Sequence, residues 1–197
     1  MTPLAEAWER AGVRRGAAPA AAAVMPTGFP DLDGCLEGGG WPVGVLAELR
    51  ASRAGIGEMR LLLPVLAALS REGWLVWVAP PYRPCAPALA AHGIVLDHLA
   101  VVRPRTHKEA LWAVSQGLLS PAVGAVVTWF ADIRDQEFRV LQRQAAEGRR
   151  WSFCFLPRDL APKPSRLRLV LESAPQGVRV TLARKAGRPV APLIVAL

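Results

Sequence analysis

The feature that most constrains the fold is an alternation of short apolar runs with helical patterns through the middle of the chain. Residues 60–71, 106–120 and 132–148 carry apolar side chains at helical spacing, and Thr106 with Glu109 forms a helix-capping pattern. Five runs have the length and residue types of buried strands: VLAEL, WLVWVAP, LAVVRP, GAVVTWF and WSFCFLP. This order predicts an α/β fold with a largely parallel central sheet and right-handed crossovers.

The C-terminal third of the chain instead alternates with a period of two. Apolar residues occupy every second position in SRLRLVLES and again in GVRVTLAR. Because the turn sequence APQG joins these segments, they predict an antiparallel hairpin with one buried face.

The opposite face of this hairpin is predicted to be basic. Residues 131–197 carry a net charge of +7, against +1 for residues 1–130. The basic side chains expected on this face are Arg166, Arg168, Arg179, Arg184 and Lys185. Two interpretations stay open: a solvated surface that keeps the protein soluble, or a surface that binds DNA or an acidic partner.

Length and composition favour one folded domain with short appendages. The chain has 197 residues, of which 52% are hydrophobic, and this is enough for a sizeable core. We predict an N-terminal amphipathic helix and linker (1–23), a main domain (24–189) and a C-terminal tail (190–197).

No apolar stretch approaches the ~20 residues of a membrane span, and the N-terminus lacks signal-peptide order, so we expect a cytoplasmic protein.

The tryptophans and cysteines form no catalytic or metal-binding pattern. The three cysteines are far apart and lack metal-ligand spacing, which favours buried thiols. Trp74, Trp77 and Trp112 fall in predicted strands and a helix, and we assign them to the core. Leu4 and Trp8 form an apolar stripe on the N-terminal helix, where they either anchor a partner or pack on their own domain.

The stretch LRASRAGIGEMRLLLP lies between the first core strand and a helix, where nucleotide-binding proteins place a phosphate loop. Such a loop requires the pattern G-x-x-x-x-G-K-[ST], because lysine reaches the phosphates and the hydroxyl holds magnesium. The same frame here contains Ser52, Gly57, Glu58 and Met59. Only the second glycine of the pattern is kept.

Several longer segments resemble known families. MPTGFPDLDGCLEGGGWPVGVLAEL resembles the segment before the phosphate loop of RecA-family recombinases, and LRLVLES with VRVTLARKAGRP resembles their late hairpin. Four further segments are similar to the ImuA family, whose members have also been labelled after the cell-division inhibitor SulA. These segments are GGGWPVG, GIGEMRLLLP, WVAPPYRPCAPALAAHGI and LWAVSQGLLS. This resemblance covers residues 24–189 and implies a RecA-like P-loop-type fold with a degenerate phosphate loop.

The resemblance also implies that the machinery of an ATPase is missing. A glutamate at the lysine position turns an attraction of roughly 4 kcal/mol into a repulsion of similar size, at ~4 Å and an effective dielectric of ~20. The magnesium-site aspartate falls on Trp129, or on Thr128 if the alignment shifts by one residue, and VAPPYRP (78–84) contains no acid. We therefore expect no catalytic residues, no cofactor and no metal.

Resemblance to ImuA implies a non-catalytic adaptor in damage-induced translesion DNA synthesis, located in the cytoplasm and at the nucleoid during damage. The implied partners are ImuB, which is an inactive relative of the Y-family polymerases, an error-prone replicative polymerase alpha subunit, and RecA. DNA contact through the basic C-terminal third is a further expectation. Two alternatives stay open: a SulA-like cell-division inhibitor, and a residual nucleotide- or DNA-binding protein.

Overall fold

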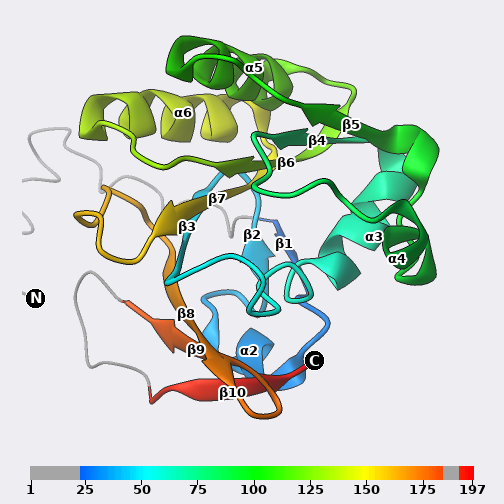
Figure 1. Ribbon diagram of the computed structural model, residues 1–197, viewed down its shortest axis with the longest axis vertical. Helices are drawn as coiled ribbons and strands as arrows, with labels where there is room; N and C mark the ends of the chain where they lie inside the picture. The colour runs from blue at the N-terminus through cyan, green and yellow to red at the C-terminus, as the bar shows by residue number, and fades with distance from the viewer. Residues whose placement is uncertain (1–22, 184–190) are drawn as a thin grey trace, which may run out of the picture.

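An eight-stranded mixed sheet forms the centre of the molecule (Figure 1). The computed structural model describes residues 23–183 and 191–197. Across the sheet the strands follow the order β10, β9, β8, β3, β7, β6, β4, β5. Their bounds are β3 Leu46–Ala51, β4 Trp74–Val78, β5 Leu99–Val102, β6 Val123–Trp129, β7 Trp151–Pro157, β8 Arg168–Ala174, β9 Gly177–Leu182 and β10 Leu193–Ala196. The short strands β1 (Val24–Met25) and β2 (Trp41–Pro42) form a separate antiparallel pair.

Parallel and antiparallel pairing divide the sheet into two parts. The strands from β8 to β5 pair in parallel, whereas β9 pairs antiparallel to β8, and β10 pairs antiparallel to β9. The predicted C-terminal hairpin is therefore confirmed as β8 and β9. Strand β10 lies within residues 190–197, the segment predicted as a tail, so most of that segment adds a strand to the sheet.

Helices cover both faces of the parallel part. On one face lie α3 (Leu63–Glu72) and α4 (Ala86–Ala91), with α2 (Pro30–Cys35) towards β10 and the 3-10 helix η1 (Leu96–His98) before β5. On the other face, α5 (His107–Leu119) and α6 (Asp135–Gly148) lie side by side, as the upper part of Figure 1 shows. The predicted cap of α5 is confirmed, because the Thr106 side chain accepts a hydrogen bond from the Glu109 N–H.

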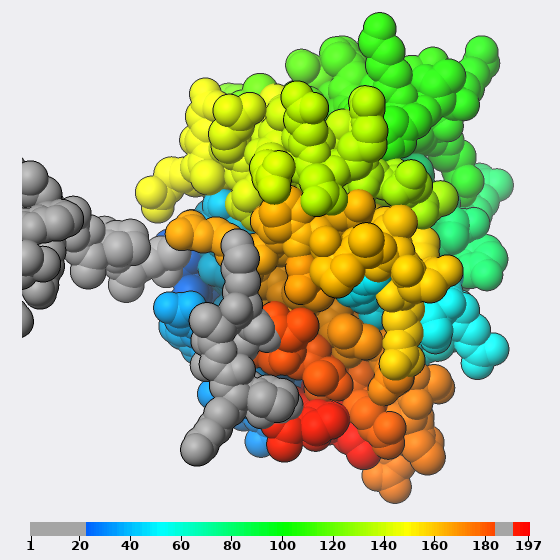
Figure 2. Space-filling model, turned by 90° about the vertical axis from the view of Figure 1, so that its left-hand side faces the viewer, coloured from blue at the N-terminus to red at the C-terminus, as the bar shows by residue number. Residues whose placement is uncertain are grey.

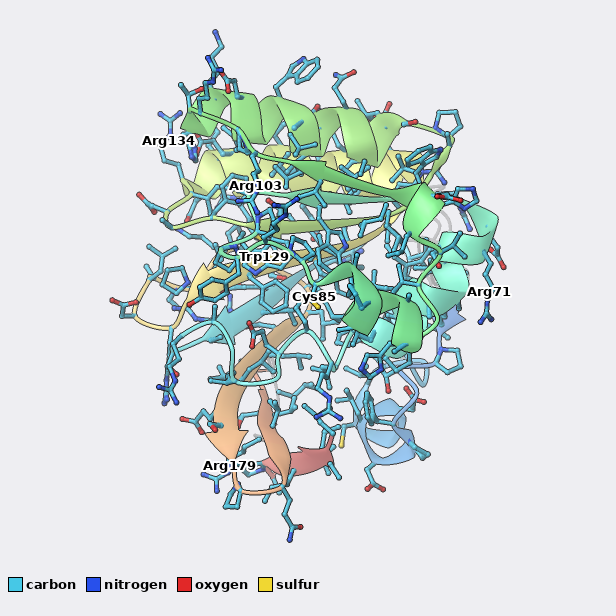
Figure 3. All side chains as sticks on the ribbon, turned by 45° about the vertical axis from the view of Figure 1, so that its right-hand side comes forward. Arg71, Cys85, Arg103, Trp129, Arg134 and Arg179 are labelled. Carbon is cyan, nitrogen blue, oxygen red and sulfur yellow. The ribbon has the colours of Figure 1, made fainter. Side chains whose placement is uncertain are left out.

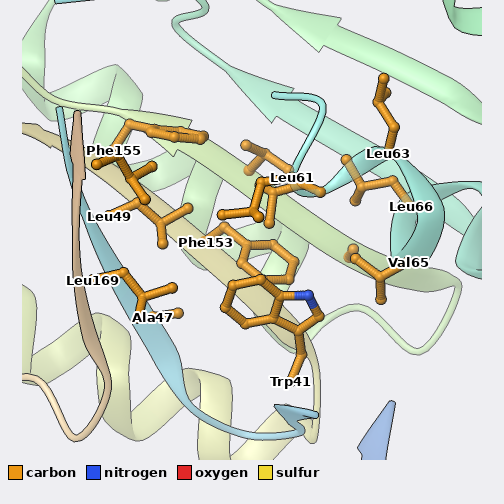
Figure 4. Close-up of a cluster of buried hydrophobic side chains, with 14 of the residues drawn as sticks. Trp41, Ala47, Leu49, Leu61, Leu63, Val65, Leu66, Phe153, Phe155 and Leu169 are labelled. Carbon is orange, nitrogen blue, oxygen red and sulfur yellow. The ribbon is translucent and has the colours of Figure 1, made fainter. Parts of the chain in front are cut away.

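The larger hydrophobic core lies under α3 and extends to the hairpin. Leu49 of β3, Phe153 of β7 and Leu169 of β8 all point into it and are almost completely buried. Figure 4 shows Phe153 against Trp41, with ring centroids 5.2 Å apart in an edge-to-face arrangement. A second core, beneath α5 and α6, contains Leu46, Val126 and Phe138.

The predicted RecA-like P-loop-type fold is wrong in the feature that defines such a fold. A phosphate loop would lead directly into the N-terminus of a helix at Gly57. In the structure, α3 begins only at Leu63, and residues 52–62 form turns with Gly55 and Gly57 in left-handed conformations. The α/β class agrees with the structure, but the sheet is mixed and this segment is a connection of another kind.

The described residues do not test the predicted domain division. The N-terminal helix and linker (1–23), with Leu4 and Trp8, lie outside them except for Ala23. Arg184 and Lys185 of the predicted basic face also lie outside the described residues. The division into three segments therefore stays a prediction.

Candidate functional site

The segment expected to be a degenerate phosphate loop folds around the carboxylate of one of its own residues, Glu58. Glu58 is 5% exposed, and its carboxylate accepts hydrogen bonds from the backbone N–H of Gly55 (3.0 and 3.1 Å) and of Ile56 (2.9 Å). These amides are the groups that would bind a phosphate in such a turn. Because Glu58 already occupies them, this loop has a structural role.

Replacing Glu58 with alanine is expected to lower the free energy of unfolding by about 1–3 kcal/mol, because the amides of Gly55 and Ile56 lose a charged acceptor. Chemical denaturation measures the change. The control is Glu72→Ala at the exposed end of α3, which should stay within about 0.5 kcal/mol of the wild type. Equal losses in the two variants would contradict the role of Glu58.

The position expected to have lost a magnesium ligand belongs to an aromatic cluster. Trp129 at the end of β6 stacks on Phe155, with centroids 5.2 Å apart, and meets Trp77 edge-on at 5.9 Å. Thr128, the alternative position, is completely buried. Among the described residues, no group of three histidine, cysteine or acidic side chains could hold a metal ion.

The predicted basic face of the hairpin is only partly free. Arg166 and Arg179 are exposed as expected. Arg168 is not, because its side chain is 20% exposed and its Nε donates to the carboxylate of Glu48 at 2.7 Å. Expecting Arg168 on a solvated face was therefore wrong, since the adjacent strand β3 presents a buried acid to it.

Glu48 is the centre of a buried ionic network. Its carboxylate is fully buried and also accepts a hydrogen bond from Arg50 Nη1 at 2.8 Å. Arg50 in turn donates to the carbonyls of Arg158 and Leu160. The network thereby fastens the loop 158–167 to the sheet, and Figure 2 shows this loop in gold and orange between α6 above and β8 to β10 below.

The buried cysteine next to this network is unsuited to nucleophilic chemistry. Cys154 lies on β7 beside Glu48 and is completely buried. Burial raises the pKa of the Cys154 thiol well above its usual range, and the nearby charge of Glu48 raises it further. The thiol therefore stays protonated and packs as a small apolar side chain.

A groove of about 450 Å³ opens between α5 and α6. Trp112 of α5 is 65% exposed at its rim, and Val140 of α6 is 36% exposed opposite. Gln144 joins the two helices by a hydrogen bond to Ser115 Oγ at 2.8 Å. We call this feature the α5–α6 groove, lined by Lys108, Leu111, Trp112, Ser115, Arg134, Gln136, Glu137, Val140, Leu141 and Gln144.

Charges are fixed at one end of the α5–α6 groove. Glu137 accepts hydrogen bonds from the Arg134 side chain, at 2.9 Å from Nε, and lies 3.1 Å from His107 Nε2. The hydrogen bond from Arg134 is the main cause that lowers the pKa of Glu137 to about 2. Lys108 forms no ion pair with any described residue. This end thus offers one free cation beside an exposed indole.

Assigning the tryptophans to the core was right for Trp77 and wrong for two others. Trp77 is 3% exposed, whereas Trp74 is 43% and Trp112 is 65% exposed. The buried stripe of α5 runs through Ala110, Ala113, Val114, Gly117 and Leu118. Because Trp112 falls outside this stripe, a helical-wheel comparison with its neighbours would have placed it outside the core.

Comparison with known proteins identifies the family. The family described as "Cell division inhibitor SulA" matches residues 44–152, which is more than half of the chain. The chain belongs to the SulA family. The matched region contains the parallel strands β3, β4, β5 and β6, together with both helices of the α5–α6 groove.

Curated relatives carry two different names. The chain is 25% identical over 121 residues to "Cell division inhibitor SulA" of Serratia proteamaculans, covering 60% of this chain and 72% of that protein. It is 30% identical over 110 residues to "Protein ImuA" of Caulobacter vibrioides, covering 53% of this chain and 45% of that protein. The chain thus spans less than half the length of this ImuA relative.

One solved structure that the chain matches is also a SulA protein. The crystal structure of SulA from Pseudomonas aeruginosa has 22% sequence identity and a TM-score of 0.46, covering 55% of this chain and 95% of that chain. The strand pairing and the family match correct the RecA-like P-loop-type fold class to an α/β fold with a mixed sheet in a SulA-family protein. Within the described part of the chain, no helix is long and apolar enough to cross a membrane.

Proposed function

We propose that this protein is a non-catalytic adaptor of the DNA-damage response that acts in translesion DNA synthesis. The observation that carries the proposal is the 30% identity to a protein named ImuA over 110 residues. Three features favour binding over catalysis: the occupied amides at Glu58, the buried thiol of Cys154, and the exposed indole of Trp112. We place the protein in the cytoplasm and, during damage, at the nucleoid.

The α5–α6 groove is the surface that we assign to the partner. Trp112 and Val140 offer apolar contact area, and Lys108 supplies a cation without an ion-pair partner among the described residues. A complementary segment carries an apolar side chain for the indole and a carboxylate for Lys108. An ImuB-like protein is the first candidate, followed by an error-prone polymerase alpha subunit and RecA.

The test is to immobilise the purified full chain and to measure its binding to each purified candidate from the same genome. Binding of the ImuB-like protein, with or without the polymerase subunit and RecA, supports the adaptor. Absence of binding to all three would contradict it.

Replacing Trp112 with alanine is expected to weaken binding of the ImuB-like protein about 30-fold, because an exposed tryptophan at a groove is a typical binding hot spot. Trp74→Ala is the matched control, since Trp74 is 43% exposed and lies on β4, away from the α5–α6 groove. The control should bind like the wild type. Retained binding by the Trp112 variant would remove the groove from the proposal.

A SulA-like cell-division inhibitor is the second candidate function. It is favoured by the family match over residues 44–152 and by the SulA relative from Serratia. This function predicts that the full chain binds the division tubulin and suppresses its polymerisation, which light scattering measures. Suppression of polymerisation without binding to the ImuB-like protein would favour the inhibitor over the adaptor.

A further inference from the structure

Neighbouring parallel strands end together at one edge of the sheet. Strands β5, β4, β6, β7 and β3 lie next to one another in this order. Their register pairs residues at or near the ends of adjacent strands: Val78 with Val102 and Thr128, Trp129 with Phe155, and Ala51 with Pro157. We call this side the carboxyl edge. The five strands are separated by four spacings of about 4.8 Å, so the carboxyl edge is about 19 Å long, which is the length of several nucleotides.

Exposed arginines follow the strands at the carboxyl edge. Arg103 directly follows β5, Arg83 lies in the loop after β4, and Arg53 lies two residues beyond β3. All are exposed, and none forms an ion pair within residues 23–183 and 191–197. The exposed acids that follow these strands are Asp132, Asp135 and Asp159, and Asp135 pairs with Lys163. The edge therefore presents a row of free cations.

An exposed aromatic side chain, Tyr82, directly precedes Arg83 in the chain. Tyr82 is 68% exposed in the loop after β4. Ala79 begins this loop with a φ of 56°, a conformation that is strained for a residue with a side chain, and its N–H donates to the Val102 carbonyl at 2.9 Å. Prolines 80 and 81 then restrict the chain up to Tyr82. The start of this loop is thus tied to the end of β5, and the two prolines limit how far Tyr82 can move from that point.

We propose that the carboxyl edge binds single-stranded nucleic acid, with phosphates along Arg53, Arg83 and Arg103 and a base stacked on Tyr82. Arginines spaced along a groove and an exposed ring are the elements that bind single strands without sequence preference. A free nucleotide is not favoured, because Glu58 occupies the nearby loop amides. A nucleic acid strand is favoured over an acidic protein because its regularly repeated phosphates suit several separate arginines, whereas one free cation accompanies the exposed ring in the α5–α6 groove. Figure 3 labels Arg103 and Trp129 on this edge.

The triple variant Arg53→Gln, Arg83→Gln, Arg103→Gln tests the phosphate contacts. Fluorescence anisotropy of a labelled 20-nucleotide oligo-dT strand is measured with the full chain at several salt concentrations. We expect at least tenfold weaker binding. The slope of log K against log salt should become less negative by about 2, since three phosphate contacts are lost and each contributes about −0.7. A matched control removes three exposed arginines elsewhere, Arg71, Arg143 and Arg149, and should change affinity less than threefold.

Variants of Tyr82 separate nucleic acid from an acidic protein. Tyr82→Leu is expected to weaken oligo-dT binding about fivefold or more, whereas Tyr82→Phe keeps the ring and should bind like the wild type. Poly-glutamate should compete poorly. The proposal is overturned if the wild type does not bind oligo-dT, if the control triple variant loses as much as the edge variant, or if Tyr82→Leu has no effect and poly-glutamate competes equally. All substituted side chains are exposed, and circular dichroism checks that each variant folds.

Discussion

Replacing Glu48 with alanine is expected to lower the free energy of unfolding by about 3–5 kcal/mol. Glu48 is fully buried, and its carboxylate accepts hydrogen bonds from Arg50 at 2.8 Å and from Arg168 at 2.7 Å. Without it, the guanidinium of Arg50 stays buried, with carbonyl oxygens as its remaining partners. A buried charge without its counter-ion is costly, and the loop 158–167 loses its anchor. Urea denaturation measures the loss, and limited proteolysis reports on the loop.

The matched control for Glu48 is Glu172→Ala, which removes the acid of an exposed ion pair. Glu172 pairs with Arg158, whose side chain is 53% exposed. Solvent screens such a pair, so we expect a loss below about 1 kcal/mol. If the two variants lost similar amounts, the loop would not depend on the buried network, and the role assigned to Glu48 would be wrong.

Replacing Phe153 with alanine is expected to lower the free energy of unfolding by about 3–5 kcal/mol as well. Phe153 is 1% exposed, comes from a strand in the middle of the sheet, and packs edge-on against Trp41. Its removal leaves a cavity between the sheet and the chain before β3. The surrounding buried side chains, drawn in Figure 4, are closely packed and cannot easily move to fill it. Thermal and urea denaturation both measure the change.

The control for Phe153 is Ile194→Ala, which removes an apolar side chain from β10 where it is 50% exposed. Its loss should be about 0.5 kcal/mol or less. A small loss for Phe153 would mean that the larger core repacks freely, contrary to the packing described above.

The elements of the sheet could be predicted because their signals are local. The runs WLVWVAP and GAVVTWF became β4 and β6, since a strand buried on both faces must be apolar along its length. The period of two in the C-terminal third became β8 and β9. Short local motifs likewise predicted the cap at Thr106 and the end of α6 at Gly148.

The site residues were harder to predict because their surroundings come from distant segments. Arg168 is neutralised by Glu48, which lies 120 positions earlier in the sequence. The role of Glu58 depends on how the turn at Gly55 and Ile56 folds back, which the spacing of the motif did not reveal. The RecA-like fold class was inferred from the order of motifs and was wrong, since similar loops can join a strand to a helix in different ways.

The two main surfaces suit different ligands. The α5–α6 groove combines an exposed tryptophan with one free cation, which suits a protein segment. The carboxyl edge combines a row of arginines with Tyr82, which suits a polyanion with bases. Because the substitutions at the two surfaces share no residue, loss of one activity leaves the other measurable.

The central claim is that the protein binds a protein partner through the α5–α6 groove without using a nucleotide. Calorimetric titration of the ImuB-like protein into the wild type, Trp112→Ala and Trp74→Ala, each with and without Mg-ATP, tests it most directly. We expect a Kd that Mg-ATP does not change, that is about 30-fold higher for Trp112→Ala, and that is unchanged for Trp74→Ala. Binding that requires Mg-ATP, or that survives in the Trp112 variant, would contradict it.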